Sequence, residues 1–388
     1  MFLSSLEQYN PSLISVAVNL HKTGQILPDT YVIDLEALKN NTKKIVNVAK
    51  KNNIELLYMT KQLGRNPVIA KTIEEAGIPY SVAVDFREAE MYMENHLHIG
   101  NVGNLVQCPR LLVEKILNYG TKYVTVYSIS NLKYINDVAR KLGIIQKVLL
   151  KVIGENDELY PGQVGGLTLK ELDNNFDEIV SLKYIQLSGI TVFPALLYNH
   201  KVNKIEPTSS LKTVNDVKLI FKKHNYPMNV LSLPSATCCD SIPLIKKLGG
   251  TEGEPGHGLT GTTPMHAFNK EPEIPAYCYV SEISHNFKKH SYFYAGGFYR
   301  RGHLKNALVF ENDKEKTASV LPFDDESIDY YLELNQPFKE GSTVITAFRT
   351  QIFVTRSSVA LVDGITSGKP NLIGIFDSQG RPLPEGMK

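Results

Sequence analysis

Short runs of apolar and β-branched residues alternate with longer amphipathic stretches between residue 30 and about residue 260. The amphipathic stretches show the helical spacing of apolar residues, and several are bounded by capping residues. Residues 66–77 open on Asn-Pro and close on glycine, and residues 130–143 run from Ser130, a candidate N-cap, to a glycine. The runs that predict strands are LLYMT (56–60), YSVAV (80–84), VGNLV (102–106), YVTVYS (123–128), KVLLKVI (147–153), LSGITVF (187–193), NVLSLPS (229–235) and TEGEPG (251–256).

Eight strand candidates, each followed by a helix candidate, predict an α/β protein with a parallel (β/α)₈ TIM barrel. The predicted barrel covers residues 30–271, close to the length of about 250 residues that is typical of the fold. An open doubly wound sheet has the same local pattern. No strand is followed by a GxGxxG turn, which argues against the dinucleotide-binding form of that sheet.

The pattern changes after about residue 272, where strand-like runs follow one another closely and helical periodicity is weak. This change predicts a C-terminal β-rich domain over residues 272–388. A further strand candidate, TYVIDLEAL (30–38), precedes the barrel, and we expect it to pair into the β-rich domain. Residues 1–29 are then an N-terminal extension.

Composition narrows the class of protein. The 388 residues are 43% hydrophobic and 21% charged with a net charge of +2, so we expect neither nucleic acid nor a membrane as a partner. The four cysteines lack CxxC spacing, which argues against a zinc cluster or a disulfide framework. The N-terminus shows no signal-peptide pattern, and no apolar run approaches the about 20 residues of a membrane helix. The sequence therefore predicts a cytoplasmic protein.

Lys61 stands where the first predicted barrel strand ends, in the stretch ELLYMTKQLGRNP. Active sites of (β/α)₈ barrels lie at the carboxyl ends of the strands. A lysine that is desolvated there has a lowered pKa and can form an imine with a carbonyl compound. The alternative is an ordinary lysine in a surface loop.

Two loops point to an anion site on the same face of the barrel. LPSAT (233–237) follows the seventh strand candidate, and EPGHGLTGTTP (254–264) follows the eighth. The loops after strands seven and eight form the common phosphate site of such barrels, because glycines let backbone N–H groups approach an anion. A lysine facing a phosphate site indicates a phosphorylated aldehyde cofactor, and pyridoxal 5′-phosphate fits that description.

These motifs resemble those of the alanine racemase-like, fold-type III pyridoxal phosphate enzymes, particularly the YhfX-type branch, over nearly the whole chain. In this resemblance Lys61 matches the imine lysine, and KQLGR replaces the family's KAN-x-Y-like turn. Arg65 falls at the place of the family tyrosine that contacts the phosphate. LPSAT resembles the family turn NSAG, which implies phosphate binding by Ser235 together with Ala236 and Thr237.

The second loop, EPGHGLTG, resembles the family sequence RPGIALYG, which implies that the backbone amides of Gly256 and His257 also bind phosphate. Glu254 replaces an arginine that faces the pyridine nitrogen in alanine racemases. A carboxylate there keeps the ring nitrogen protonated and makes the ring a stronger electron sink, and related decarboxylases carry EPGR at this place. GITVFPA resembles the family GIYTHFA, so Phe193 is the candidate that stacks on the ring.

FYAGGFYRRG (293–302) resembles the family motif GYxDGYxR, whose first tyrosine reaches the partner subunit's active site. By position this is Tyr294, and Gly296 departs from the family aspartate. Racemisation needs an acid/base group on each face of the planar intermediate. The resemblance therefore implies a homodimeric racemase or epimerase with shared active sites, in which Lys61 and Tyr294 are the two bases, assisted by Arg300 or Arg301.

Recognition of the substrate carboxylate departs from the family, because the loop after the fifth strand contains no arginine. Gln163 is the nearest match there, and Arg300, Arg349 and Arg356 are the other candidates for substrate binding. The identity of the amino acid stays open.

Two alternatives keep the cofactor: a decarboxylase or a lyase similar to D-serine dehydratase, and a non-catalytic, regulatory pyridoxal phosphate protein. Related lyases bind a metal through C-terminal residues, and His303 and Asp363 are a candidate pair of this kind. Because ten histidines are scattered through the chain, the prediction is no metal.

Overall fold

The computed structural model describes residues 2–311, 314–324 and 326–384. By its internal contacts the chain divides into two compact units. The barrel unit comprises residues 44–59 and 73–256, and the β-domain unit comprises residues 1–43, 60–72 and 257–388. Lys61 and the residues around it thus belong to the β-domain unit, although they lie within the barrel in sequence.

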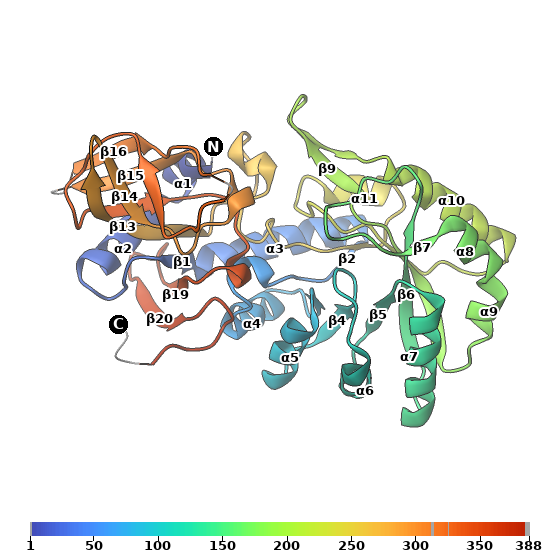
Figure 1. Ribbon diagram of the computed structural model, residues 1–388. Helices are drawn as coiled ribbons and strands as arrows, with labels where there is room; N and C mark the ends of the chain where they lie inside the picture. The colour runs from blue at the N-terminus through green and yellow to red at the C-terminus, as the bar shows by residue number, and fades with distance from the viewer. Residues whose placement is uncertain (1, 312–313, 325, 385–388) are drawn as a thin grey trace. The chain divides into compact units, whose positions relative to one another are not determined.

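A parallel sheet closed on itself forms the centre of the barrel unit (Figure 1). Its spatial strand order is β2-β12-β11-β8-β6-β5-β4-β3, with β7 paired to β6. A parallel bridge between Tyr58 and Ser81 joins the two ends of the sheet. The strands are β2 (Glu55–Leu56), β3 (Ser81–Ala83), β4 (Ile99–Val102), β5 (Tyr123–Val126), β6 (Gln146–Ile153), β7 (Leu167–Thr168), β8 (Ile185–Thr191), β11 (Val230–Ser232) and β12 (Glu252–Gly253).

Amphipathic helices separate these strands, and α7, α8 and α9 pack along β5, β6 and β8 (Figure 1). Polar side chains set their starts: Asp85 caps α5, and Thr168 and Glu171 form a capping box on α8. The helices are α3 (Leu35–Asn52), α4 (Pro67–Glu75), α5 (Phe86–Glu94), α6 (Arg110–Asn118), α7 (Ile129–Leu142), α8 (Leu169–Asn174), α9 (Phe176–Ser181), α10 (Ser210–Lys223) and α11 (Ile242–Lys247).

Two local predictions in the barrel were wrong. The N-cap of α7 is Ser128, whose side chain accepts the Asn131 N–H at 3.2 Å, and not Ser130. The third strand covers Ile99–Val102 instead of residues 102–106, because Gly103 adopts a φ of 93° and ends it. The cap lies two residues earlier than predicted, and the strand begins three residues and ends four residues earlier.

The β-domain unit is built on a mixed sheet in the order β16-β15-β18-β13-β1-β19-β20, with β14 and β17 joined to it through β13. Helices α1 (Phe2–Tyr9) and α2 (Pro11–Lys22) bury their apolar faces against this sheet (Figure 1). The strands are β1 (Thr30–Asp34), β13 (Tyr277–Phe287), β14 (His290–Tyr294), β15 (Asn306–Glu311), β16 (Lys314–Ser319), β17 (Tyr331–Leu334), β18 (Thr343–Thr346), β19 (Ser358–Asp363) and β20 (Asn371–Phe376).

The expected strand at residues 30–38 does pair into the second sheet, since β1 lies between β13 and β19. It ends at Asp34, whose carboxylate accepts the Ala37 N–H at 3.0 Å in the first turn of α3. The four residues that follow Asp34 are therefore helical and not extended. Helix α3 begins there.

A two-stranded hairpin, β9 (Leu196–Asn199) and β10 (Lys204–Pro207), projects from the barrel unit after β8 (Figure 1). Among the described residues, no helix is both long enough and apolar enough to cross a membrane. The predicted fold class, an α/β barrel with a β-rich C-terminal part, is confirmed. The expected domain limits at 29/30 and 271/272 stay a prediction.

Candidate functional site

The turn after β11 presents a set of backbone amides at the carboxyl edge of the barrel strands. Ser235 and Ala236 have φ angles of 143° and 48°, a conformation that residues other than glycine rarely adopt. The Ser235 hydroxyl accepts the Leu196 N–H at 3.1 Å, which anchors the turn. Within the described part of the chain, the N–H groups of Ser235, Ala236 and Thr237 have no protein acceptor. Consecutive unpaired amides in a tight turn are typical of an anion site.

Glu254 lies next to this turn, because β11 and β12 are neighbours in the sheet. Its N–H donates to the Thr237 hydroxyl at 3.0 Å, so the two loops are tied together. Its side chain is buried, and the Asn104 Nδ2 donates to both carboxylate oxygens at 3.3 and 3.4 Å. The barrel unit thus holds a fixed carboxylate beside a candidate anion site.

A chain of hydrogen bonds continues from Asn104 to a buried lysine. The Tyr127 hydroxyl donates to the Asn104 carbonyl, and the Lys151 Nζ donates to the Tyr127 hydroxyl at 3.3 Å. Lys151 is completely buried, and burial lowers its pKa to about 8. Asn104, Tyr127 and Lys151 were not predicted from the sequence as site residues. The available signal was Lys151 itself, a charged residue inside the apolar run KVLLKVI.

Two further predicted residues lie in the barrel unit. The Gln163 carbonyl accepts a hydrogen bond from the Lys151 Nζ at 3.2 Å, so this loop residue does reach the polar network. Phe193 is half-buried, and its ring lies 5.5 Å from the ring of Tyr160. Phe193 is therefore not fully buried in the core, and its stacking on a cofactor ring stays a prediction.

Lys61 begins the 3₁₀ turn η1 (Lys61–Leu63) of the β-domain unit and is partly exposed. The Thr60 carbonyl accepts the N–H groups of Leu63 and Arg65, which closes the turn. Gly64 has a φ of 69°, and a Cβ atom there would lie 3.1 Å from the Ile352 side chain. A left-handed, closely packed glycine therefore holds the backbone that carries Lys61.

His257 lies near Lys61 in the same unit. Burial lowers the pKa of His257 well below its ordinary value, and the nearby side chains of Arg349, Lys61 and His266 lower it further. The imidazole is therefore neutral, with Nδ1 at 3.5 Å from the Thr262 hydroxyl. The Nε2 atom is buried and has no hydrogen-bond partner in the described part of the structure.

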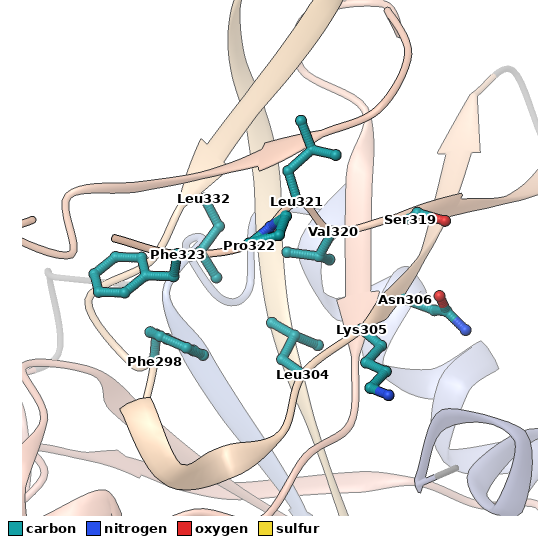
Figure 2. Close-up of a pocket in the computed structure, with 10 residues that line it drawn as sticks. All are labelled: Phe298, Leu304, Lys305, Asn306, Ser319, Val320, Leu321, Pro322, Phe323 and Leu332. Atoms are coloured by element: carbon teal, nitrogen blue, oxygen red, sulfur yellow. The ribbon is translucent and has the colours of Figure 1, made fainter. Parts of the chain in front are cut away.

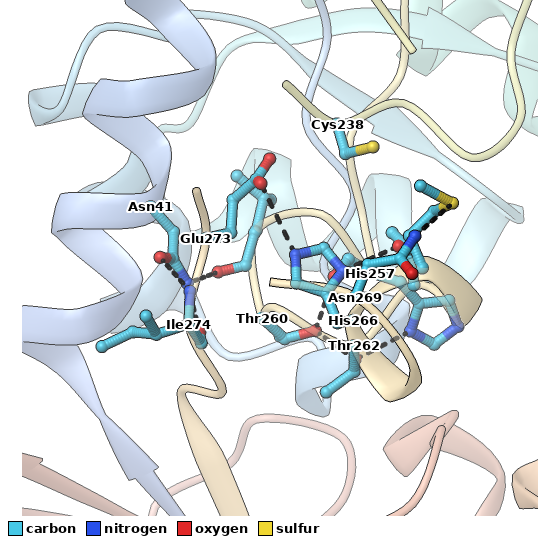
Figure 3. A network of polar contacts seen from close by, with 12 residues as sticks. Asn41, Cys238, His257, Thr260, Thr262, His266, Asn269, Glu273 and Ile274 are labelled. Carbon is cyan, nitrogen blue, oxygen red and sulfur yellow. Dashed lines mark hydrogen bonds and ion pairs between the residues drawn. The ribbon is translucent and has the colours of Figure 1, made fainter. Parts of the chain in front are cut away.

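The loop that carries His257 is held rigidly (Figure 3). The Asn41 Nδ2 of α3 donates to the carbonyls of Leu259 and Ile274 at 3.0 and 2.8 Å. Further along the loop, His266 Nε2 lies 3.5 Å from a carboxylate oxygen of Glu273, and both side chains are buried. The position of His257 is thus set by α3 and by its own loop.

Arg65 is buried in the β-domain unit with a φ of 52°. Its guanidinium lies 4.5 Å from the centre of the Phe353 ring and donates to the Gln379 side chain at 3.1 Å. These contacts hold the segment after Lys61 against the C-terminal part of the chain. Phosphate binding by Arg65 stays a prediction.

Tyr294 ends β14, and its partly exposed ring lies 5.7 Å from the ring of Tyr331. The space beside the following Gly296 is occupied by Asp29. A Cβ atom at Gly296 would lie 2.0 Å from the Asp29 Oδ2, and the Asp29 Oδ1 accepts the Tyr279 hydroxyl at 2.7 Å. Asp29 therefore supplies a carboxylate near the place where the family motif has its aspartate.

The three candidate arginines of the β-domain unit have different surroundings. Arg300 is exposed, donates to the Ser327 carbonyl and lies over the Phe323 ring. Arg356 is exposed and forms an ion pair with Asp329 at 3.6 Å. Of these three arginines, Arg349 is the one that lies near the predicted residues Lys61 and His257. Like Lys61, it lowers the pKa of His257.

A cavity of about 440 Å³ lies within the β-domain unit (Figure 2). It is lined mainly by apolar side chains such as Phe298, Leu304 and Phe323, and none of the predicted site residues borders it. Among the described residues, no group of three His, Cys, Asp or Glu side chains is placed to hold a metal ion.

Comparison with known families gives two matches that follow one another along the chain. The model described as "Alanine racemase, N-terminal domain" matches residues 33–264, and the model described as "YhfX-like, C-terminal domain" matches residues 278–372. Among curated proteins, the "Uncharacterized protein YhfX" of Escherichia coli (strain K12) is 43% identical over 385 residues, covering 99% of this chain and all of that protein.

Solved structures with a similar fold include enzymes of different reaction types. An alanine racemase of Clostridium difficile 630 has a TM-score of 0.65 at 16% identity and covers 91% of this chain and 99% of its own. A D-threonine aldolase from Filomicrobium marinum has a TM-score of 0.66 at 15% identity, with 91% and 95% covered. A diaminopimelate decarboxylase from M. jannaschi has a TM-score of 0.66 at 13% identity, with 96% and 95% covered. At these identities the likeness concerns the fold alone.

Proposed function

Because this chain belongs to the alanine racemase-like proteins, in their YhfX-type branch, we propose that it is a pyridoxal phosphate-dependent amino acid racemase or epimerase. The proposal includes a cytoplasmic homodimer, in which Tyr294 of one subunit serves the active site of the other. Lys61 is the residue that carries the cofactor.

The observation that carries the proposal is the pair of loops at residues 235–237 and 254. Three unpaired backbone amides are suited to a phosphate, and Glu254, tied to the same turn through Thr237, is suited to a protonated ring nitrogen. One small molecule that has both an anionic tail and a basic ring matches this combination. Gly256 and His257 are the proposed additional amide donors, and Phe193 is the proposed stacking residue.

Bound pyridoxal phosphate would supply an electron sink for the negative charge that forms when the Cα proton of the substrate leaves. Lys61 holds or returns that proton on one face, and the Tyr294 hydroxyl does so on the other. Asn104 keeps the Glu254 carboxylate oriented with two hydrogen bonds. The neutral His257 adds no charge next to Lys61.

The first test asks whether Lys61 carries the cofactor. Wild-type protein reconstituted with pyridoxal phosphate is expected to show a visible absorption band that borohydride abolishes with covalent retention of the cofactor, and Lys61→Ala is expected to show neither. Lys71→Ala, in the neighbouring helix α4, is the matched control. A band that survives in Lys61→Ala contradicts the assignment.

The second test identifies the reaction. Incubation with single L-amino acids in D₂O is expected to exchange the Cα proton and to erase optical rotation for at least one of them. Tyr294→Phe is expected to lower racemisation by about 10²- to 10⁴-fold, the usual contribution of a general acid or base. Racemisation at the wild-type rate in Tyr294→Phe contradicts the two-base assignment.

A second candidate function, decarboxylation or β-elimination, is favoured by Glu254. A carboxylate at the ring nitrogen supports a carbanion more strongly than the arginine of alanine racemases does. Release of CO₂ or ammonia in the same screen, with no D-amino acid formed, supports this alternative. Cofactor binding with no exchange for any amino acid supports a regulatory role.

A further inference from the structure

Lys151 is an ammonium group buried without a counter-ion. Its side chain is completely buried in β6, and among residues 2–311, 314–324 and 326–384 no carboxylate forms an ion pair with it. Its partners are all neutral: the Tyr127 hydroxyl at 3.3 Å, the Gln163 carbonyl at 3.2 Å and the face of the Tyr127 ring at 4.6 Å. Burying an unpaired charge is costly, so an anionic ligand that pairs with this group would offset that cost.

Two unpaired polar side chains lie beside it. Thr191 is opposite Lys151 in the parallel pairing of β6 and β8, so both side chains lie on the same face of the sheet. Thr191 is completely buried, and its hydroxyl has no partner among the described residues; the same is true of the side-chain oxygen of Gln163. An ammonium has three donors, and two of those on Lys151 are occupied.

We propose that Lys151, Thr191 and Gln163 bind the carboxylate of the amino acid substrate. The inference rests on the proposed function and deepens it, because the loop after β6 lacks an arginine that could do this. The position is suitable, since hydrogen bonds through Tyr127 and Asn104 connect Lys151 to Glu254, the proposed partner of the ring nitrogen. An incoming carboxylate neutralises the ammonium and takes up its third donor. The Thr191 hydroxyl donates a further hydrogen bond, and the Gln163 side-chain amide donates through its NH₂ group.

The protonation of Lys151 sets the pH range of binding. Burial alone lowers the pKa of Lys151 to about 8, so the charged form predominates at neutral pH and disappears above it. Tyr127, the titratable group in contact with the amine, stays neutral because burial raises its pKa to about 12. Carboxylate binding is therefore expected to weaken as the pH rises above about 8.

The test compares Lys151→Met with Lys147→Met, an exposed lysine on the same strand. The probe is propionate, at constant ionic strength, with propionamide as the neutral probe, and the readout is the melting temperature of the apoprotein. Propionate is expected to raise the melting temperature of wild type and of Lys147→Met, but not that of Lys151→Met. Without any probe, Lys151→Met is expected to melt higher than wild type, because an unpaired buried charge has been removed. A purely structural lysine would give the opposite shift.

A second measurement uses the cofactor-loaded protein. Alanine and ethylamine differ by a carboxylate. The affinity of the protein for each is measured from the change in cofactor absorption, and the ratio of the two affinities reports recognition of the carboxylate. Lys151→Met is expected to lower this ratio by about 10- to 100-fold with ethylamine binding unchanged.

Equal responses of wild type and Lys151→Met to propionate overturn the inference. A rise in the melting temperature of wild type with bicarbonate but not with propionate also overturns the inference. It would indicate that the Lys151 amine reacts with carbon dioxide instead of binding a carboxylate. If the protein binds no pyridoxal phosphate but keeps its propionate response, the proposed function fails and the anion site stands. If the cofactor binds and the affinity ratio does not change in Lys151→Met, the inference fails and the proposed function stands.

Discussion

The identity of residue 296 is explained by the side chain that occupies the space beside it. Gly296 departs from the aspartate of the related motif, and a sequence alone gives no reason for the change. The structure gives one, because the Asp29 carboxylate already occupies the adjoining space and accepts the Tyr279 hydroxyl. A residue that is distant in sequence thus supplies the carboxylate beside Gly296.

This relation predicts the outcome of exchanging the two residues. Gly296→Asp is expected to destabilise the protein by several kcal/mol, because it brings a second carboxylate against Asp29. Asp29→Gly keeps the positive φ of 68° without strain, and adding it to Gly296→Asp is expected to restore at least half of the lost stability. The measurement is urea unfolding of the two single variants and the double variant. Additive losses would show that the residues do not share this space.

The existence of the strands and helices was predicted more accurately than the residues at which they begin and end. All eight barrel strands and the extra strand before them exist, because alternating apolar runs separated by amphipathic helices leave few other folds. The ends depend on individual capping hydrogen bonds. The sequence predicted Ser130 as the N-cap of α7. The observed N-cap is Ser128, two residues earlier, which has the extended backbone (φ −150°, ψ 152°) that an N-cap needs.

The correction for α7 is directly testable. Ser128→Ala is expected to lower the free energy of unfolding by about 1 kcal/mol, because the Asn131 N–H loses its acceptor. Ser130→Ala is the matched control, since this exposed hydroxyl accepts only the Arg110 side chain at 3.2 Å, and its expected effect is near zero. Chemical unfolding of both variants measures the difference. Equal losses would contradict the assignment of the cap.

At the scale of the whole molecule, each unit brings together candidate site residues that are distant in sequence. The barrel unit brings together Ser235, Thr237 and Glu254, and the β-domain unit brings together Lys61, His257 and Arg349. Tyr294 is proposed to act on the partner chain, as the related motif does.

The proposed sharing of sites between subunits predicts complementation. Lys61→Ala and Tyr294→Phe homodimers are each expected to be nearly inactive. In a mixed dimer one site carries both changes and the other carries neither, so refolding equal amounts together is expected to restore about a quarter of wild-type activity. Separate incubation of each variant under the same conditions is the control. No recovery, with mixed dimers verified by mass, would mean that Tyr294 serves its own chain or no site.

The sequence by itself determined the architecture and the motif positions. Hydrophobic periodicity and the LPSAT and EPGHG turns are local patterns, which can be recognised without knowing which residues are in contact. It did not identify the network of Asn104, Tyr127 and Lys151. These residues are ordinary in their own segments, and only the pairing of strands far apart in the sequence brings them together.

The tertiary structure also decided which candidates were engaged elsewhere. Arg356 pairs with Asp329, whereas Arg349 lies close enough to His257 to depress its pKa. Hydrogen bonds, ion pairs and desolvation act over a few ångströms in space, and chain order does not encode those distances directly. The sequence therefore determined what kind of protein this is, and the folded chain decided which of its charged groups lie close to one another.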